Sequence, residues 1–476
     1  MNKQECAIKY ITENYLEYNR LRHDIVSDKL QIRIADSLED ASLQNAPEGL
    51  QFRGSEYWRE MTKHDINSIV CHAAQEYDAN ITSREVMTAL QSDLIPQVHP
   101  LREYILSLHP WGGQVDWIDF VAQQVRVTHS VESCRMVQNG VESSSAENTM
   151  LHNATQPLPN STQPLPNATQ QLPNATPSYT TLHNTTPNAD RLWRLCFKKW
   201  FVAMVASWMK DEVVNHQVLV LIGRQGIFKT TWLEHLIPPH LRAYACKLAN
   251  SNDLNKDERL RIAEFGLISL DEIDSMNNRE LNQLKSIITS SDVNERAAYA
   301  YTKERRVRLA SFCASGNRRD FLTDITGNRR WLPFEVESIQ NPFYTIMPYK
   351  QMYAQAWALA QDPNFNYWFE LDEIDVLEQH NQHFRDESNE EQLLPILFDV
   401  PAEGRGEFMT TAQISERLVT YGNIKKPMAL SRLGMVLGTA GFKATKRKIG
   451  NIQTRGWIVY QRDTDEISAL RRILKD

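Results

Sequence analysis

The sequence predicts an α/β fold in which alternating strands and helices build a parallel sheet, and three segments carry this prediction. The first is the apolar run VLVLI at 218–222, which leads through GRQGIFKTT into WLEHL: a strand, a glycine-containing turn and a helix start. The second and third, FGLISLDEID at 265–274 and VRLASFCASGN at 307–317, are apolar strands that end in polar side chains. Their spacing fits compact β-α-β units.

The turn at 223–231 follows the pattern of a phosphate-binding loop with one substitution. The pattern is glycine, four residues, glycine, lysine, then serine or threonine, and Phe228 takes the place of the second glycine. Backbone N–H groups of such a turn point at phosphate, and its lysine adds a mobile cation. The alternative is an ordinary turn with a chance lysine, and the Phe228 side chain either points outward or weakens binding. The predicted nucleotide-binding residues are Gly223, Arg224, Gln225, Gly226, Ile227, Phe228, Lys229, Thr230 and Thr231.

The second strand delivers two adjacent carboxylates, Asp271 and Glu272, to its carboxyl end. Such a pair suits a nucleotide bound with Mg²⁺, so ATP and Mg²⁺ are the expected cofactors. We expect Thr230 and Asp271 to hold the metal, and Glu272 to polarise the attacking water. The alternative is a strand followed by an acidic helix cap.

Two further positions are candidates for catalysis. Asn317, at the end of the third strand, could orient the water or sense the γ-phosphate, and a plain turn or cap is its alternative. Arg329 and Arg330 stand just before another apolar strand, WLPFEV. A guanidinium there could reach the γ-phosphate of a neighbouring subunit, whereas simple surface solvation is the alternative.

The composition of the chain argues against several classes of protein. The chain has 476 residues, 42% of them hydrophobic and 23% charged, enough for two to four domains. The start MNKQECAIKY lacks the apolar region of a signal peptide, and stretches such as FVAMVASWM at 201–209 are too short to span a bilayer. We therefore expect a cytoplasmic protein with no membrane partner. Six scattered cysteines without a CxxC pair indicate neither a disulfide framework nor a zinc ribbon.

The chain divides visibly along its length. Between 128 and 190 it becomes rich in Asn, Thr, Ser, Pro and Gln, with the repeats NATQPLP, NSTQPLP and NATQQLP, which predict a disordered insert. The predicted organisation is an N-terminal α+β region of unknown role (1–98), a helical segment (99–127), the insert (128–190), the α/β core (191–345), a helical acidic connector (346–400) and a basic domain (401–476).

The C-terminal part is sharply polarised in charge. Residues 371–408 hold eleven acids and two arginines, whereas residues 425–462 hold nine bases and no acid. Two predicted helices followed by two strands around a tight turn make a winged helix. The basic excess favours duplex DNA as its partner, and protein docking is the alternative. The candidate DNA-binding residues here are Arg432, Lys446, Arg447, Lys448 and Arg455.

The series GRQGIFKTT, LISLDE, SSDVNERAAYAYTKERRVRLASFCASGN and FLTDITGNRRWLPFEV resembles the ATPase domain of the virulence-associated protein E family, relatives of the superfamily 3 helicases with an AAA+ type P-loop core. The most specific piece is the D-x-T-G-N-R-R-aromatic-x-P arrangement, and HPLREYILSLHPWGGQVDWIDF also fits, so the resemblance covers 99–339. It implies a DNA-dependent ATPase of prophages or mobile elements that assembles as a homo-oligomeric ring, of which a hexamer is one form. The chain departs from the family at Phe228 and at ASGN.

The resemblance also implies a DNA-contacting hairpin in the ring channel, at YAYTKERRVR. Basic side chains beside aromatic ones suit a single DNA strand, and a solvated charged strand is the alternative. The candidate residues are Lys303, Arg305, Arg306 and Arg308.

Two functions remain open at this point. The first is a helicase or replication-initiation ATPase, working with a primase or another replication partner. The second is a nucleotide-gated DNA-binding protein with little or no hydrolysis, which the substitution at Phe228 keeps open.

Overall fold

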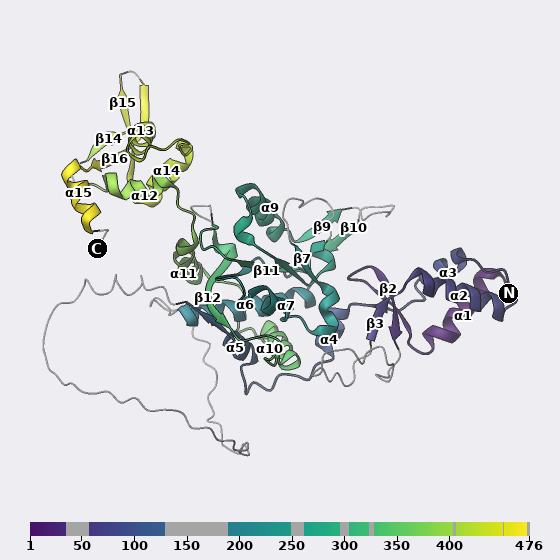
Figure 1. Cartoon of the computed structure of the whole chain (residues 1–476). Coiled ribbons are helices and arrows are strands. Elements are labelled where there is room, and N and C mark those ends of the chain that lie inside the picture. The colour runs from purple at the N-terminus through teal and green to yellow at the C-terminus, as the bar shows by residue number, and fades with distance from the viewer. Residues whose placement is uncertain are drawn as a thin grey trace, which may run out of the picture.

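The structure, a computed structural model, describes residues 1–34, 57–128, 189–248, 261–295, 304–322, 328–402, 406–450 and 452–473. Nearly all of the predicted insert at 128–190 lies outside these ranges, as does Lys303. Figure 1 shows a central body between an N-terminal and a C-terminal unit. In the described part of the chain, no helix is long and apolar enough to cross a membrane.

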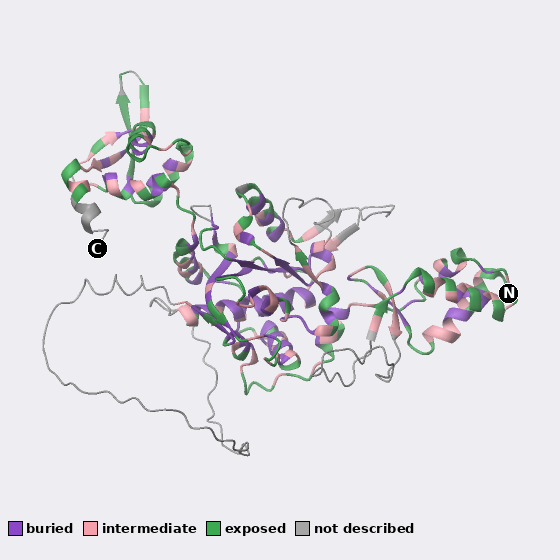
Figure 2. Ribbon diagram, in the orientation of Figure 1, coloured by how far each residue is buried: buried purple, intermediate pink, exposed green. Residues whose placement is uncertain are grey.

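The central body is built on a six-stranded sheet in the order β5-β12-β6-β11-β8-β7. Neighbouring strands from β12 to β7 are parallel, and β5 joins the edge antiparallel. Every residue of β6 is buried, as expected for a parallel strand covered on both faces. Figure 2 shows that buried residues gather in the centre of this body. The strand bounds are β5 (Val125–Val127), β6 (Val218–Ile222), β7 (Ala245–Leu248), β8 (Leu267–Leu270), β11 (Ser311–Gly316) and β12 (Trp331–Ile339).

The two faces of this sheet bury two separate apolar clusters. Because side chains alternate along a strand, Leu219 and Leu221 of β6 pack with the aromatic side chains of α6 (Ala189–Met209), while Val220 packs with the leucines and isoleucines of α9 (Asn278–Thr289). The covering elements also include α4 (Pro100–Leu106), α5 (Trp117–Ala122), α7 (Lys229–Glu234), η4 (Pro239–Tyr244), η6 (Ile273–Ser275), η7 (Asn328–Arg330), α10 (Tyr349–Gln361), α11 (Leu371–Asn381) and η8 (Gln382–Phe384).

The predicted strand at 307–317 is split in the structure. Its first residue ends β10 (Glu304–Val307), which pairs antiparallel with β9 (Asp292–Glu295), and β11 begins only at Ser311. The cause is Arg308, which is fully buried between the two strands and donates hydrogen bonds to several backbone carbonyls.

The N-terminal unit joins helices to a four-stranded sheet in the order β3-β2-β1-β4. Its buried Asp24 accepts a hydrogen bond from the Tyr244 hydroxyl of the central body at 2.7 Å, and Asp28 pairs with Arg306 at 2.9 Å. These contacts fix the unit beside β10. Its elements are α1 (Lys3–Ile11), η1 (Thr12–Leu16), β1 (Leu21–Asp24), β2 (Lys29–Ile34), β3 (Tyr57–Glu60), α2 (Lys63–Glu76), α3 (Ser83–Leu90) and β4 (Gln97–Val98).

The C-terminal unit has its own apolar core around Trp457. That core takes in Leu394 and Leu397 of α12, so the unit begins inside the predicted connector 346–400. The earlier connector helices α10 and α11 contribute Met352 and Leu377 to the central body instead. The elements are α12 (Asn389–Leu397), β13 (Phe398–Asp399), β14 (Glu407–Met409), α13 (Thr411–Gly422), α14 (Leu430–Thr439), β15 (Lys443–Ile449), β16 (Ile452–Gln461) and α15 (Thr464–Ile473).

The predicted mixed α/β class is confirmed by these sheets and helices. The predicted helix-helix-hairpin order after residue 401 is present too: Thr410 caps α13, α14 follows, and β15 pairs with β16, which also pairs with β14.

His380 ties α11 to β12 and makes this packing sensitive to acid. Its ring N–H donates to the Pro333 carbonyl at 2.7 Å, and burial lowers its pKa from 6.5 to about 4. Because the folded state binds the proton less tightly than the unfolded chain, stability is full above pH 6.5 and falls as the pH drops toward 4. The expected loss is at most about 1.4 kcal/mol per pH unit.

The substitution His380→Gln keeps an N–H donor but removes the titration. Urea denaturation of the two proteins between pH 7 and pH 4 should give a shallower loss of stability for the variant. Equal pH dependence in both would contradict the assignment.

Candidate functional site

The turn between β6 and α7 is held against both neighbouring strands. The Gly223 N–H donates to the Gly316 carbonyl of β11 at 3.1 Å. A Cβ atom on Gly223 would lie 2.6 Å from the Val336 carbonyl oxygen of β12, so only glycine fits here. Gly226 has φ +85°, the left-handed region that glycine favours. Exposed Arg224 and Gln225 lie between these two glycines, with Ile227 after them.

Phe228 adopts the backbone conformation that the missing glycine would supply. Its φ is 67° and its ψ 19°, and it caps the amino end of α7. The left-handed region costs a residue with a side chain about 1–2 kcal/mol. Its ring lies edge to face with Phe343, with the ring centres 6.5 Å apart. The question left open by the sequence is therefore answered: the side chain turns outward, toward the segment after β12.

Lys229 is buried at the start of α7, and its ammonium group is directed back at the turn. The Nζ atom donates to the carbonyls of Gly223 and Arg224, both at 2.7 Å, and to the Asn317 side-chain oxygen at 3.3 Å. Burial lowers the pKa of Lys229. The lysine therefore joins two sequence-predicted segments, the turn and the end of β11.

Asp271, directly after β8, accepts hydrogen bonds from three side chains. Its Oδ1 receives the hydroxyls of Thr230 at 3.2 Å and Ser315 at 2.8 Å, and its Oδ2 pairs with Lys247 at 2.8 Å. Burial raises the pKa of Asp271, but the bonds from Lys247 and Ser315 outweigh it, so the pKa falls below its usual value. The carboxylate is therefore ionised and is held at the turn.

Glu272 has a left-handed backbone, φ 53°, and is exposed. Among the described residues with positive φ, all others except glycines and Phe228 are Asn or Asp, which tolerate this conformation. Strained residues of this kind cluster at functional sites. The structure describes no hydrogen bond or ion pair to the Glu272 carboxylate.

Three further residues complete this edge of the sheet and were not predicted from the sequence. They are Ser315 and Lys247, described above, and Asp274, whose carboxylate accepts the N–H groups of Asn317 and Arg318 at 3.2 and 3.1 Å. Asp274 lies within the motif LDEID and Ser315 within ASGN, so both motifs contained a signal. Lys247 had none, because only the pairing of β7 with β8 brings it beside Asp271.

Arg329 and Arg330 lie at the opposite edge of the sheet from Lys229. They precede β12, whose first residue Trp331 pairs with Val218 at the start of β6, whereas Lys229 follows the end of β6. Four strand residues separate the two edges, which corresponds to about 13 Å. His216, which precedes β6, lies on the same side as these arginines. Its pKa is lowered mainly by burial, and the charge of Arg330 lowers it further.

The predicted DNA-contacting hairpin is corrected at Arg308. The residue has no exposed surface, its guanidinium donates to the carbonyls of Ile288 and Asn215, and it lies over the Phe312 ring. The prediction that Arg308 contacts DNA is therefore wrong. Arg306 is partly buried and paired with Asp28, and Arg305 is placed on β10, while Lys303 lies outside the described residues.

The basic residues of the C-terminal unit gather on the β15–β16 hairpin. Lys446 and Arg455 are exposed and directly opposite each other in the ladder, and Lys448 is exposed on the same strand as Lys446. Like charges in such a pair repel, and within the described residues no acidic group pairs with them. Arg447 lies over the Phe408 ring, and Arg432 is half-buried on α14.

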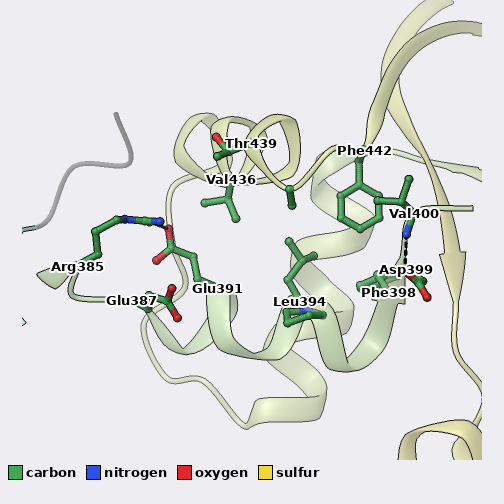
Figure 3. A pocket seen from close by; sticks show the side chains of 12 residues that line it. Arg385, Glu387, Glu391, Leu394, Phe398, Asp399, Val400, Val436, Thr439 and Phe442 are labelled. Atoms are coloured by element: carbon green, nitrogen blue, oxygen red, sulfur yellow. Dashed lines mark hydrogen bonds and ion pairs between the residues drawn. The ribbon is translucent and has the colours of Figure 1, made fainter. Parts of the chain in front are cut away.

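A cavity of about 300 Å³ lies in the same unit, between α12, α14 and β13 (Figure 3). At one end Arg385 pairs with Glu391 at 3.0 Å, and Leu394, Val436 and Phe442 line the other part. None of the predicted site residues borders it.

The edge around Lys229 has the chemistry to hold a phosphate and a hard cation. Strand ends at a switch in strand order are the usual ligand sites of open α/β sheets, and here β11 and β12 lie on either side of β6. Mg²⁺ takes oxygen ligands and is usually bound by one or two carboxylates together with substrate phosphates. Thr230 and Asp271 offer oxygens of that kind, 3.2 Å apart.

Comparison with known proteins gives a family for part of the chain. Residues 168–386 match the family model described as the virulence-associated protein E-like domain, which confirms the resemblance seen in the sequence. The match leaves out the segment 99–120. No curated protein matches the sequence.

Solved structures to which the chain shows some similarity include the apo structure of the NrS-1 C-terminal region (305–718), at 9% identity and a TM-score of 0.43. The similarity covers 96% of this chain and 100% of that one. The A form of the same apo region has 9% identity, a TM-score of 0.40 and the same coverage of both chains.

The conformation of Phe228 generates a prediction with two matched variants. Phe228→Gly removes the backbone strain together with the ring, whereas Phe228→Ala removes the ring and keeps the strain. We therefore expect the glycine variant to be the more stable of the two, by about 1 kcal/mol in urea denaturation. An alanine variant of equal or greater stability would show that residue 228 is not left-handed.

Proposed function

Since this chain carries a virulence-associated protein E-like domain, we propose that it is a DNA-dependent ATPase, a ring-forming helicase or replication-initiation protein of the superfamily 3 type with a P-loop core. One observation carries the proposal. Lys229, Asp271 and Asn317 follow three separate strands and lie at one edge of the sheet. Lys229 contacts Asn317 at 3.3 Å, and Asp271 contacts the residues next to them, Thr230 at 3.2 Å and Ser315 at 2.8 Å.

The proposed roles follow from where each group lies. Backbone N–H groups of the turn and of the α7 start receive the phosphates, and Lys229 moves from the turn carbonyls to the phosphate oxygens. Thr230 and Asp271 hold Mg²⁺, which neutralises charge on the phosphates when it is bound. The Glu272 carboxylate, exposed at the same edge, accepts a proton from the attacking water, and Asn317 orients that water.

Among the described residues, no group of three or more His, Cys, Asp or Glu side chains could hold a metal by itself. A magnesium ion that arrived with ATP would need no such group, because one or two carboxylates, the phosphates and water can supply its oxygens.

Arg329 and Arg330 fit the site only if a second copy of the chain supplies them. The sheet keeps them on the side opposite their own Lys229, and Arg329 is exposed there. A ring of identical subunits would bring this side of one copy against the nucleotide edge of the next. The guanidinium would then stabilise the charge that develops on the γ-phosphate.

DNA is proposed to contact two surfaces. The C-terminal unit has the helix, helix and hairpin of a winged helix, and Lys446, Lys448 and Arg455 would neutralise duplex phosphates. Repulsion within the Lys446–Arg455 pair would be relieved by such a polyanion. Of the β9–β10 hairpin residues, Arg306 would have to leave Asp28 before it could contact a strand.

The alternative, a nucleotide-gated DNA-binding protein with little hydrolysis, is favoured by one observation. Phe228 stands where the phosphate-loop pattern has a glycine and holds a left-handed backbone at the cost of strain, and this departure favours binding over rapid hydrolysis. Turnover measurements separate the two functions.

The first prediction concerns catalysis. Lys229→Ala should abolish ATP binding, while Glu272→Gln should keep binding and lower DNA-stimulated hydrolysis by about 100-fold or more, because it removes only the general base. Hydrolysis would be measured as the release of phosphate, and unwinding would be measured as strand displacement on a tailed duplex. ATP binding without DNA-stimulated hydrolysis or displaced strand would favour the alternative.

The second prediction tests whether the arginines act between subunits. Lys229→Ala and Arg329→Ala chains should each be inactive, whereas a mixture should recover part of the ATPase rate, since mixed contacts pair an intact Lys229 with an intact Arg329. The same mixture with Arg330→Ala identifies which arginine acts. Failure of both mixtures, in oligomers shown to exchange subunits, would contradict the shared site.

A further inference from the structure

A group of large apolar side chains stands exposed just after β12. Phe343 has 68% of its surface exposed, Tyr344 87% and Ile346 81%. The turn that presents them is well bonded, because the Asn341 carbonyl accepts the N–H groups of Tyr344 and Thr345, each at 3.1 Å. These side chains are therefore held outward by the backbone.

This group lies beside the phosphate turn. The Phe343 ring is edge to face with Phe228, at 6.5 Å and 82°, and with His235, at 5.5 Å and 86°. Phe228 is the residue immediately before Lys229, and His235 caps the carboxyl end of α7. An exposed aromatic ring thus stands next to the helix whose amino end would receive the phosphates.

We propose that Phe343, supported by Phe228 and His235, is the stacking surface for the base of the bound nucleotide. The inference rests on the proposed function, since it takes the phosphates to lie on the turn 223–230. A planar base needs an aromatic face that is fixed in place and still open. Two perpendicular ring contacts fix Phe343, and its exposure leaves room for a planar partner.

The proposal also explains why a phenylalanine stands at position 228 instead of a glycine. Glycine at this position would free the backbone of strain but would leave Phe343 with the His235 contact alone. The side chain that departs from the phosphate-loop pattern therefore supports the ring that receives the base.

The test compares two ligands on the full-length chain, MgATP and magnesium tripolyphosphate, which has the phosphates but no base. Base–aromatic stacking predicts that Phe343→Ala weakens MgATP binding about tenfold and leaves tripolyphosphate binding unchanged. Phe343→Trp should restore MgATP affinity. Ile346→Ala, which removes an even more exposed apolar side chain from the same segment, should change neither affinity.

Three results would overturn the inference. An equal loss for both ligands in Phe343→Ala would mean that the ring only supports the turn. Unchanged MgATP affinity would exclude stacking, and if the oligomer also dissociated, the apolar group would be a contact with a second copy. A wild-type chain that bound neither ligand would refute the proposed function itself, which distinguishes that failure from the first two.

Discussion

The parallel pairing of β6 with β11 on one side and β12 on the other is the constraint on which the rest of the site depends. It places Gly223 against the carbonyls of Gly316 and Val336, so close that no side chain fits. The turn must then cross the sheet edge where Asn317 leaves β11. One strand further along, β8 delivers Asp271 to the same edge. Three distant segments meet there because their strands are parallel and in register.

The same strand pairing separates the charged residues of the proposed site into two groups. Lys229 and Asp271 follow strand ends, whereas Arg329 and Arg330 precede a strand, so the sheet holds them on opposite sides. In the ring of subunits that we propose, this separation would place the site between two copies of the chain. Phe228 and Glu272, the two strained residues outside Asn and Asp, stand at the ends of β6 and β8. Their strain is concentrated where the site is, in agreement with a functional rather than a structural cause.

The sequence predicted the parts of this site that follow from local pattern. Local sequence was sufficient to predict the apolar run before Gly223, the carboxylates after LISL and the helices and hairpin after Thr410. Each of these features depends on neighbours in the chain. The position of Lys247 could not be predicted in this way, since only the pairing of β7 with β8 brings it beside Asp271. Arg308 resembled a surface base, but its guanidinium is buried and donates to backbone carbonyls of separate segments, which no local pattern brings together. The direction of the Phe228 ring likewise depended on Phe343, which is far away in the chain.

The central claim is that one sheet edge holds a nucleotide, and hydrogen exchange tests it most directly. Saturating MgATP should slow amide exchange together in 223–233, 271–274 and 317–318, because phosphates and metal would tie these segments to one ligand. The hairpin 443–461 should stay unchanged until DNA is added. Exchange that is unaltered in all three segments, or slowed only elsewhere, would contradict the account.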